Sequence, residues 1–430
     1  MCHAAKPLRR RAVLLMGSWV NKLGSQWPTA YRIVEGMLGE EDPVLQLAAV
    51  GTLRAMVEDW DFKEETFLPH IPGCMQHLAT ILSVAVECDT QLKVFGLMTL
   101  MIERLGQSIK PYMQGLLSLL PQVWHQSNDN ALLRIQVLLA LQEIVNILGP
   151  ESTAAYGVLL PVLGLATDIS QPDELNLLED GLGLWLVALR NAPQPHPQLL
   201  QLFPNLHAVM ARSTEHIRVA CQIIISAVLL GGQSFLAQHG ASVVTIVTDA
   251  IGNVNERGML ILLPVLETII TCYPKEAPGS LEAALTKLLA LVLRGGESTS
   301  VVAASSGVFA RMLLNNSSEW PSYFQRYAAH VPLPAGAPSA GSHGDALMLA
   351  FVDVWLGQLD SIAQPAARKL SGLALCRLLC IPHIGVLERL DSIVAAVTGL
   401  WHEVEGGADD GTRIVYGYDY YTVISGGGMA

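Results

Sequence analysis

The stretch NALLR at residues 130–134 marks the start of a predicted helix, and its pattern recurs along the chain. Asn130 comes first, and Arg134 follows four places later. Asn, Asp, Ser and Thr favour the first place because their side-chain oxygen accepts a hydrogen bond from a backbone N–H that the first helical turn leaves unpaired. The same spacing between a cap residue and a following register residue begins at Asp42, Asp89, Thr214, Asn253 and Ser298.

The register residues divide the chain into repeats. They are Gln46, Lys93, Arg134, Glu179, Arg218, Arg257 and Val302, and only Glu179 lacks a cap residue before it. Their spacings are 47, 41, 45, 39, 39 and 45 residues, and a second apolar helix is predicted before each junction. Two helices recurring at this period are the signature of HEAT and armadillo arrays. The sequence therefore predicts an all-α fold, an α-α superhelix of about nine or ten HEAT/armadillo-like helical pairs.

Long polar side chains at the register places predict hydrogen bonds between neighbouring repeats. Such an inter-repeat ladder is expected at Lys93, Arg134, Arg218, Arg257 and Arg368, the last of which follows Gln364 by four places. The alternative is that these residues are unrelated, solvated helix starts. Their common spacing favours the ladder.

Composition along the chain predicts where the array begins and ends. We expect residues 1–402 to form the solenoid, interrupted by a flexible loop at about 329–345 that is rich in Ala, Pro and Gly. The Gly- and Tyr-rich tail at 403–430 is predicted to be disordered. Residues 9–23 resemble the second helix of a pair without its first helix, so we expect the array to be truncated at its N-terminus.

Overall composition narrows the class of protein. The 430 residues are 51% hydrophobic, 6% aromatic and 15% charged, with a net charge of −12. Disordered chains are poorer in apolar residues, and nucleic-acid partners require an excess of Lys and Arg. Seven scattered Cys residues favour a reducing compartment over a disulfide framework. The longest apolar run, residues 219–230, is shorter than the ~20 residues that a bilayer requires, so no membrane insertion is expected.

No catalytic or cofactor-binding motif stands out in the sequence. Phosphate-loop, zinc-helix and nucleophile-elbow motifs are absent. Gly181-Leu182-Gly183 is half of a dinucleotide fingerprint inside an apolar helix. Cys376 and Cys380 share a helical face, where we interpret them as core residues and not as metal ligands. We therefore expect no enzyme activity, no cofactor and no metal.

Two acidic clusters are candidate contact sites for a protein partner. Asp59, Trp60 and Asp61 lie near a predicted helix end, where a solvated face is the alternative. Glu179 and Asp180 lie early in a second helix of a pair, within an otherwise apolar run. Acidic residues near a helix N-terminus are stabilising by themselves. Second helices commonly line the concave side of such arrays, so this pair is a candidate contact for a basic cargo.

Five segments resemble one known family. Residues 8–20 (LRRRAVLLMGSWV), 87–95 (ECDTQLKVF), 123–134 (VWHQSNDNALLR), 166–189 (ATDISQPDELNLLEDGLGLWLVAL) and 364–375 (QPAARKLSGLAL) are similar to the C-terminal part of importin-β superfamily receptors, or karyopherins. The importin-eleven branch is the most similar. The resemblance covers roughly residues 8–400 and is most specific at 166–189.

Family membership would imply a nuclear transport receptor that shuttles between cytoplasm and nucleus. Such receptors bind protein cargo on the concave surface, contact Phe-Gly nucleoporins between first helices, and release import cargo when they bind Ran GTPase. The importin-eleven branch is associated with import of ubiquitin-conjugating enzymes and a ribosomal protein. The family's N-terminal Ran-binding repeats have no counterpart here, so Ran binding is expected only of the full-length protein, and no Ran-contacting residues are assigned.

Two other classes of protein stay open at this point. A generic HEAT scaffold subunit of a multiprotein complex would show the same repeats, and only the resemblance argues against it. An all-α enzyme would require a closed pocket with convergent titratable groups.

Overall fold

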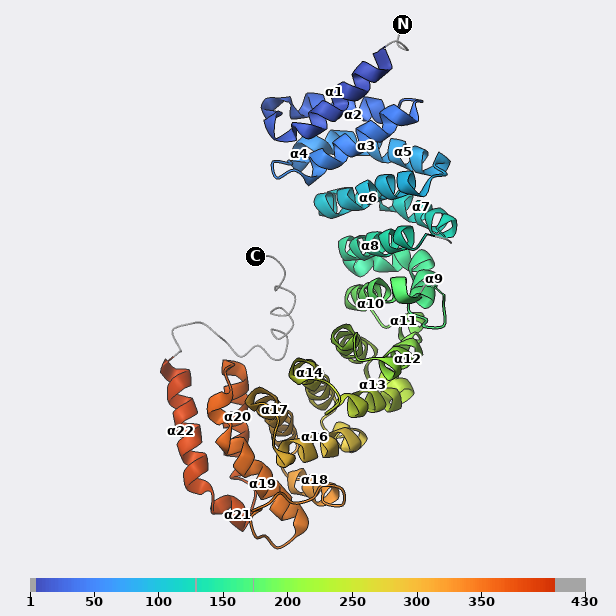
Figure 1. Ribbon diagram of the computed structural model, residues 1–430. Helices are drawn as coiled ribbons and strands as arrows, with labels where there is room; N and C mark the ends of the chain where they lie inside the picture. The colour runs from blue at the N-terminus through green and yellow to red at the C-terminus, as the bar shows by residue number, and fades with distance from the viewer. Residues whose placement is uncertain (1–4, 128–129, 173, 407–430) are drawn as a thin grey trace. The chain divides into compact units, whose positions relative to one another are not determined.

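A computed structural model describes residues 5–127, 130–172 and 174–406 (Figure 1). All regular secondary structure in these ranges is helical, which confirms the prediction of an all-α fold. The chain divides into two compact units, Met1–Val209 and Met210–Ala430, and each is described by itself.

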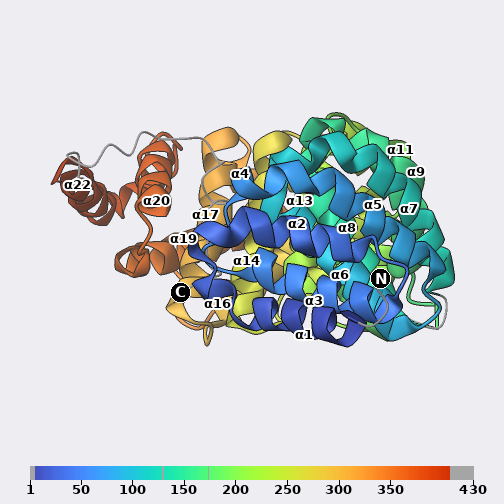
Figure 2. The ribbon, with the colours of Figure 1, turned by 90° about the horizontal axis from the view of Figure 1, so that it is seen from above.

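The first unit consists of two rows of helices. One row is α1 (Lys6–Ser18), α3 (Pro43–Glu58), α6 (Cys88–Leu105), α8 (Ala131–Leu148) and α10 (Glu174–Asn191). Each of these B helices packs on the next, as the stack in Figure 1 shows. The other row is α2 (Trp27–Leu38), α5 (Ile71–Val84), α7 (Met113–Gln126) and α9 (Tyr156–Ala166), the A helices, which pair with α3, α6, α8 and α10. Figure 2 shows the same rows turned by 90°.

Short helical segments connect these rows. They are η2 (Val20–Lys22), η3 (Gly24–Gln26), α4 (Glu64–Phe67), η4 (Leu68–His70), η5 (Gly106–Tyr112), η6 (Gly149–Ala155) and α11 (Pro197–Leu200). Gly106 and Gly149 end α6 and α8 with φ of +48° and +53°, a region that favours glycine. The chain therefore leaves each of these B helices sharply and enters a 3-10 turn. Helix α12 (Phe203–Arg212) crosses the division between the units.

The second unit repeats the arrangement. Its B helices are the first half of α13 (Ile217–Ala250), then α14 (Glu256–Cys272), α17 (Thr299–Asn315), α20 (Pro365–Leu378) and α22 (Leu390–Gly406), and each packs on the next. The A helices are the second half of α13, α16 (Glu282–Arg294) and α19 (His343–Gly357). Between them lie α15 (Ala277–Ser280), α18 (Trp320–Tyr327), η7 (Leu359–Ser361) and α21 (Ile384–Leu387).

Two stretches, 131–166 and 217–250, are long and apolar enough to cross a membrane by length and composition alone. Each contains a glycine with positive φ that breaks it into two helices, Gly149 in the first and Gly232 (φ +58°) in the second. The halves pack against neighbouring helices, and about half of each apolar window is buried, 56% and 50%. These are the properties of core helices in a stack of pairs.

Three of the predicted helix caps are confirmed. The side chains of Asp42, Asn130 and Ser298 accept hydrogen bonds from the backbone N–H groups of Val44, Leu133 and Val301. Helices α3, α6, α8 and α10 begin 45, 43 and 43 residues apart, at residues 43, 88, 131 and 174, whereas α1 begins 37 residues before α3. From α3 to α10 the period is therefore more regular than the register residues indicated.

The other three predicted caps were wrong. Asn255, not Asn253, caps α14, because the Asn253 side chain donates to the Asp249 carbonyl and completes the end of α13. Helix α6 begins after Glu87, which places Asp89 inside its first turn. Helix α13 begins after His216, because the Thr214 carbonyl accepts a bond from Ile217 N in a preceding turn.

The predicted loop and tail are shorter than expected in the described residues. Ser342 caps α19 by accepting a bond from Asp345 N, so the loop after α18 ends at residue 342. Helix α22 continues to Gly406, into the predicted tail. The remainder of that tail, residues 407–430, lies outside the described residues.

Candidate binding surfaces

Three of the predicted ladder residues make contacts within their own repeat. Lys93 Nζ pairs with Asp89 Oδ2 at 2.6 Å on its own helix, since the two are four residues apart on one exposed face. The Arg134 guanidinium lies 5.1 Å from the Trp124 ring centre, in the paired A helix of its own repeat. Arg368 donates to the Ile362 carbonyl, six residues before it. Arg218 and Arg257 are exposed in the first turns of α13 and α14.

A ladder of hydrogen bonds nevertheless joins the repeats, from other positions. Its partners are one repeat apart in sequence, with separations of 47, 40, 38, 39, 39 and 45 residues. Six of these bonds join Arg104 to Val57, Gln107 to Ile147, Gln142 to Asp180, Ser152 to Asn191, Lys287 to Thr248 and Asn315 to Ile270, and a further one joins Thr52 to Val13. Each is a side chain that donates to a backbone carbonyl of the neighbouring repeat. Several of these acceptors lie at the C-terminal ends of B helices, where carbonyls lack helical partners.

Glu179 and Asp180 lie on the solvent-facing side of α10. Glu179 is exposed and Asp180 is half-buried. Burial raises the pKa of the Asp180 carboxyl, and the charge of Glu179 raises it further. On α8, burial likewise raises the pKa of Glu143, followed by the charge of Glu103 on α6. Acidic side chains thus lie on three successive B helices, which we call the acidic strip, and repulsion acts between Glu103 and Glu143 and between Glu179 and Asp180.

The Asp59-Trp60-Asp61 cluster forms the turn between α3 and α4. The Trp60 side chain is 97% exposed, although Trp185, Trp320 and Trp355 are fully buried. Asp59 Oδ1 accepts a hydrogen bond from Asp61 N at 2.9 Å, which fixes the turn. An exposed indole held on an ordered turn is a feature of contact sites.

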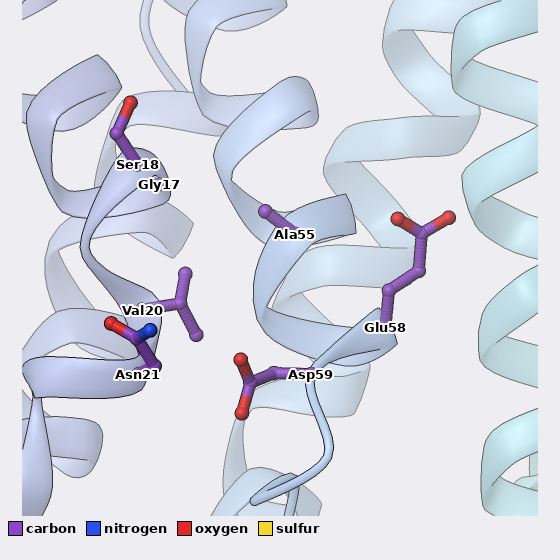
Figure 3. Close-up of a pocket in the computed structure, with 7 residues that line it drawn as sticks. All are labelled: Gly17, Ser18, Val20, Asn21, Ala55, Glu58 and Asp59. Atoms are coloured by element: carbon purple, nitrogen blue, oxygen red, sulfur yellow. The ribbon is translucent and has the colours of Figure 1, made fainter.

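Asp59 also lines a cleft of about 330 Å³ between the C-terminal ends of α1 and α3. Gly17, Ser18, Val20 and Asn21 form one wall, and Ala55, Glu58 and Asp59 form the other. Figure 3 shows the Asp59 carboxylate on the side of Asn21, whereas Glu58 points away from α1. The polar groups that line this cleft suit a cation.

An apolar groove of about 380 Å³ separates the A helices α5 and α7. Met75 and Ala79 of α5 line one side, Gly115 and Leu116 of α7 line the other, and Met98 of α6 lies among the lining residues. Sequence reasoning did not find this groove. The available signal was the small residues Ala79 and Gly115, which interrupt the outer faces of two successive A helices.

Cys376 and Cys380 were expected in the core, and that interpretation is wrong. Cys376 is exposed on α20, because the opposite face of the helix buries Ala374, Leu375 and Leu378, and Cys380 is exposed in the turn after the helix. Within the described ranges, no three His, Cys, Asp or Glu side chains gather in a way that could hold a metal ion.

Stacked helix pairs with an acidic face, an apolar groove and an exposed indole define a HEAT-type binding protein. Residues 135–425 match the family described as "Importin-11-like, TPR repeats", past residue 402, where we expected the resemblance to end. The chain belongs to this importin-11-like family.

Two curated relatives and one solved structure are similar to this chain. Human importin-11 is 32% identical over 402 residues, which cover 93% of this chain and 40% of the relative. The importin beta-like protein kap113 of Schizosaccharomyces pombe is 22% identical over 425 residues, with 97% and 42% covered. The structure of Lph2, described as a bidirectional nuclear transport receptor of S. cerevisiae, superposes with a TM-score of 0.82 at 22% identity, covering 93% of this chain and 42% of that one. The chain therefore spans about two fifths of the length of these relatives, and the Lph2 likeness confirms the HEAT-solenoid fold.

Proposed function

We propose that this chain is part of an importin-type nuclear transport receptor that carries protein cargo between cytoplasm and nucleus by non-covalent binding. Membership of residues 135–425 in the importin-11-like family carries the proposal. Binding would be spread over stacked repeats, since such arrays offer extended surfaces and not enclosed pockets. The receptor would shuttle between the two compartments and would catalyse no reaction.

The apolar groove between α5 and α7 is the proposed contact for Phe-Gly nucleoporins. Its apolar lining accepts a phenylalanine ring, and Met75 and Met98 can adapt their shape to the ring. Small residues at Ala79 and Gly115 keep the groove open. Burial of one phenylalanine supplies only about 1.5–3 kcal/mol, which fits brief contacts repeated along a flexible nucleoporin chain.

The acidic strip on α6, α8 and α10 is the proposed contact for basic protein cargo. Glu179 and Asp180 would bind cargo lysines or arginines, assisted by Glu143 and Glu103. Ubiquitin-conjugating enzymes are the proposed cargo class, by resemblance to the importin-eleven branch. Ran GTPase is proposed as a partner of the full-length receptor.

Binding of a Phe-Gly repeat peptide to the purified chain tests the proposal. Gly115→Trp would fill the groove, and since a Cβ at Gly115 meets no neighbouring atom within 4 Å, the backbone there should accept the substitution. We expect this variant to lose binding. Gly157→Trp, on α9 and outside the groove, is equally unobstructed and should bind normally.

A Ser-Gly peptide of the same length gives the background. No difference between the Phe-Gly and Ser-Gly peptides would favour the scaffold alternative. Equal binding by both Trp variants would place the nucleoporin contact elsewhere. Nuclear accumulation of the labelled chain in permeabilised cells is the matching functional measurement.

A further inference from the structure

The cleft between the ends of α1 and α3 has an occupied counterpart one repeat further along the chain. There, Arg104 at the penultimate position of α6 reaches back to the C-terminal end of α3. Its guanidinium donates to the carbonyls of Val57 and Asp59, both at 3.1 Å. The C-terminal end of a helix carries partial negative charge, so a guanidinium group at this end is stabilised.

Helix α3 bonds to α1 through Thr52 Oγ1, which donates to the Val13 carbonyl at 2.9 Å, but it supplies no guanidinium to the end of α1. Its penultimate residue is Val57, whose side chain is fully buried in the core. Ala55, which lines the cleft, is too short to cross it. The space that the Arg104 side chain fills between α3 and α6 is therefore an open cleft between α1 and α3.

The cleft walls are rich in acceptors. Asp59 contributes a carboxylate, Asn21 an amide oxygen and Ser18 a hydroxyl, which itself donates to the Leu14 carbonyl. Glu58 is paired with Arg54 at 2.8 Å. Lys22 follows Asn21, but residues 58–65 (EDWDFKEE) hold five acids and one lysine. The local charge therefore favours a cation, and a guanidinium with five donors matches the acceptors better than an ammonium does.

On each wall, an exposed tryptophan is the sequence neighbour of a lining residue. Trp60, 97% exposed, follows Asp59, and Trp19, 58% exposed, stands between Ser18 and Val20. Indole faces attract guanidinium groups and bury apolar side chains at little entropic cost. Exposure of two such large apolar side chains to water near an acidic cleft is energetically unfavourable.

We propose that this cleft binds an arginine side chain from an extended basic segment of a partner protein, with Trp60 packing against the same segment. The Asp59 carboxylate and the end of α1 would hold the guanidinium as the end of α3 holds Arg104. The site lies on α1 and α3, away from the acidic strip and the apolar groove. It stands whether or not the chain carries cargo through the nuclear pore.

Fluorescence anisotropy with a labelled peptide of alternating Gly-Ser and Arg residues tests the proposal on the whole chain. The wild-type chain should bind the peptide more weakly as salt rises. A peptide with citrulline in place of Arg keeps the shape and loses the charge, and it should not bind. Asp59→Asn and Trp60→Ala should each weaken binding about five- to tenfold, and Ala55→Arg, which places a guanidinium in the cleft, should abolish it.

Matched variants separate this site from general attraction to an acidic chain. Asp249→Asn removes the same charge from an exposed position, and Trp401→Ala removes another exposed indole, on α22. Both should bind like wild type. Equal losses in Asp59→Asn and Asp249→Asn, unchanged binding by Ala55→Arg, binding of the citrulline peptide, or no binding of the arginine peptide would each overturn the proposal. Circular dichroism of every variant confirms that its helices are intact.

Discussion

Arg104 Nε donates a 3.1 Å hydrogen bond to the carbonyl oxygen of Val57, and the two residues are 47 positions apart in sequence. This separation is one repeat. Asn315 and Ile270 show the same relationship in the second unit, across 45 positions. In both cases a polar side chain at the end of one B helix bonds to a carbonyl near the end of the preceding B helix. Successive repeats are therefore tied at the C-terminal ends of their B helices.

Removing one of these ties should loosen one interface. We expect Arg104→Ala to lower the free energy of opening of the α3–α6 interface by about 1–2 kcal/mol, because two charge-assisted bonds are lost at a partly solvated place. Amide hydrogen exchange near the end of α3 should then speed up roughly 5- to 30-fold. Arg32→Ala, at an exposed position on α2, is the control and should leave these amides unchanged. Equal amide exchange rates in both variants would mean that the Arg104 hydrogen bonds do not stabilise the α3–α6 interface.

Replacing Gly181 or Gly164 with alanine should change the stability of the fold in opposite directions, because only Gly181 lies at a close helix contact. A Cβ at Gly181 of α10 would lie 2.8 Å from the Ala166 Cβ and 2.9 Å from its carbonyl oxygen. We expect Gly181→Ala to destabilise the fold by about 1–3 kcal/mol through overpacking. Gly164→Ala, on α9, meets no atom within 4 Å and should stabilise by about 0.5–1 kcal/mol, because alanine loses less backbone entropy in a helix. Thermal midpoints of the two variants should therefore move in opposite directions.

Glu143 predicts a pH-dependent effect. Burial, and then the charge of Glu103, raises its pKa in the folded state. Just above the ordinary carboxyl range the unfolded chain therefore binds fewer protons at this site than the folded chain, so stability falls as pH rises through that window. We expect Glu143→Gln to raise the thermal midpoint at pH 7, with a gain that disappears below pH 4.

The same substitution at an exposed site is the control for this experiment. Glu215→Gln, in the turn before α13, should leave the midpoint unchanged at both pH values. A gain of similar size for both variants would indicate general relief of the chain's negative charge.

Short-range chemistry made the fold predictable. Asp42, Asn130 and Ser298 cap their helices through bonds that span two or three residues, so the pattern is visible in the sequence. The predicted cap at Asn253 was wrong because its side chain bonds to the end of the preceding helix. The local sequence does not distinguish this role from capping the next helix. Helix starts could therefore be placed to within about two residues.

The binding surfaces were less predictable because they depend on contacts between repeats. The acidic residues Glu179 and Asp180 could be named from sequence, but the interaction of Glu143 with Glu103 depends on the packing of α8 against α6. The groove depends on the spacing of α5 and α7, which local periodicity does not specify. The hydrogen bonds between repeats use side chains such as Gln142, whose partner carbonyl at Asp180 is 38 residues away.

The buried face of α20 was also predicted incorrectly. The sequence pattern places Cys376 and Cys380 on one face of an apolar helix, yet α20 ends at Leu378, Cys380 lies in the turn that follows, and both thiols are exposed. With hydrophobic residues around much of the helix, the sequence does not indicate which side is covered.

The cysteines yield a last prediction, on chemical reactivity. Cys74 and Cys221 are buried, and burial raises the pKa of each thiol to about 12, with the charge of Glu35 contributing at Cys74. Since the thiolate is the nucleophile, iodoacetamide at pH 8 should modify Cys376 and Cys380 within minutes and leave the two buried thiols intact. Mass spectrometry of tryptic peptides gives the extent at each site, and labelling in urea, where every thiol becomes accessible, sets the maximum. If Cys221 reacted as fast as Cys376 in the native chain, the structure would be contradicted. The buried Cys221 thiol could react at that rate only if α13 were open most of the time.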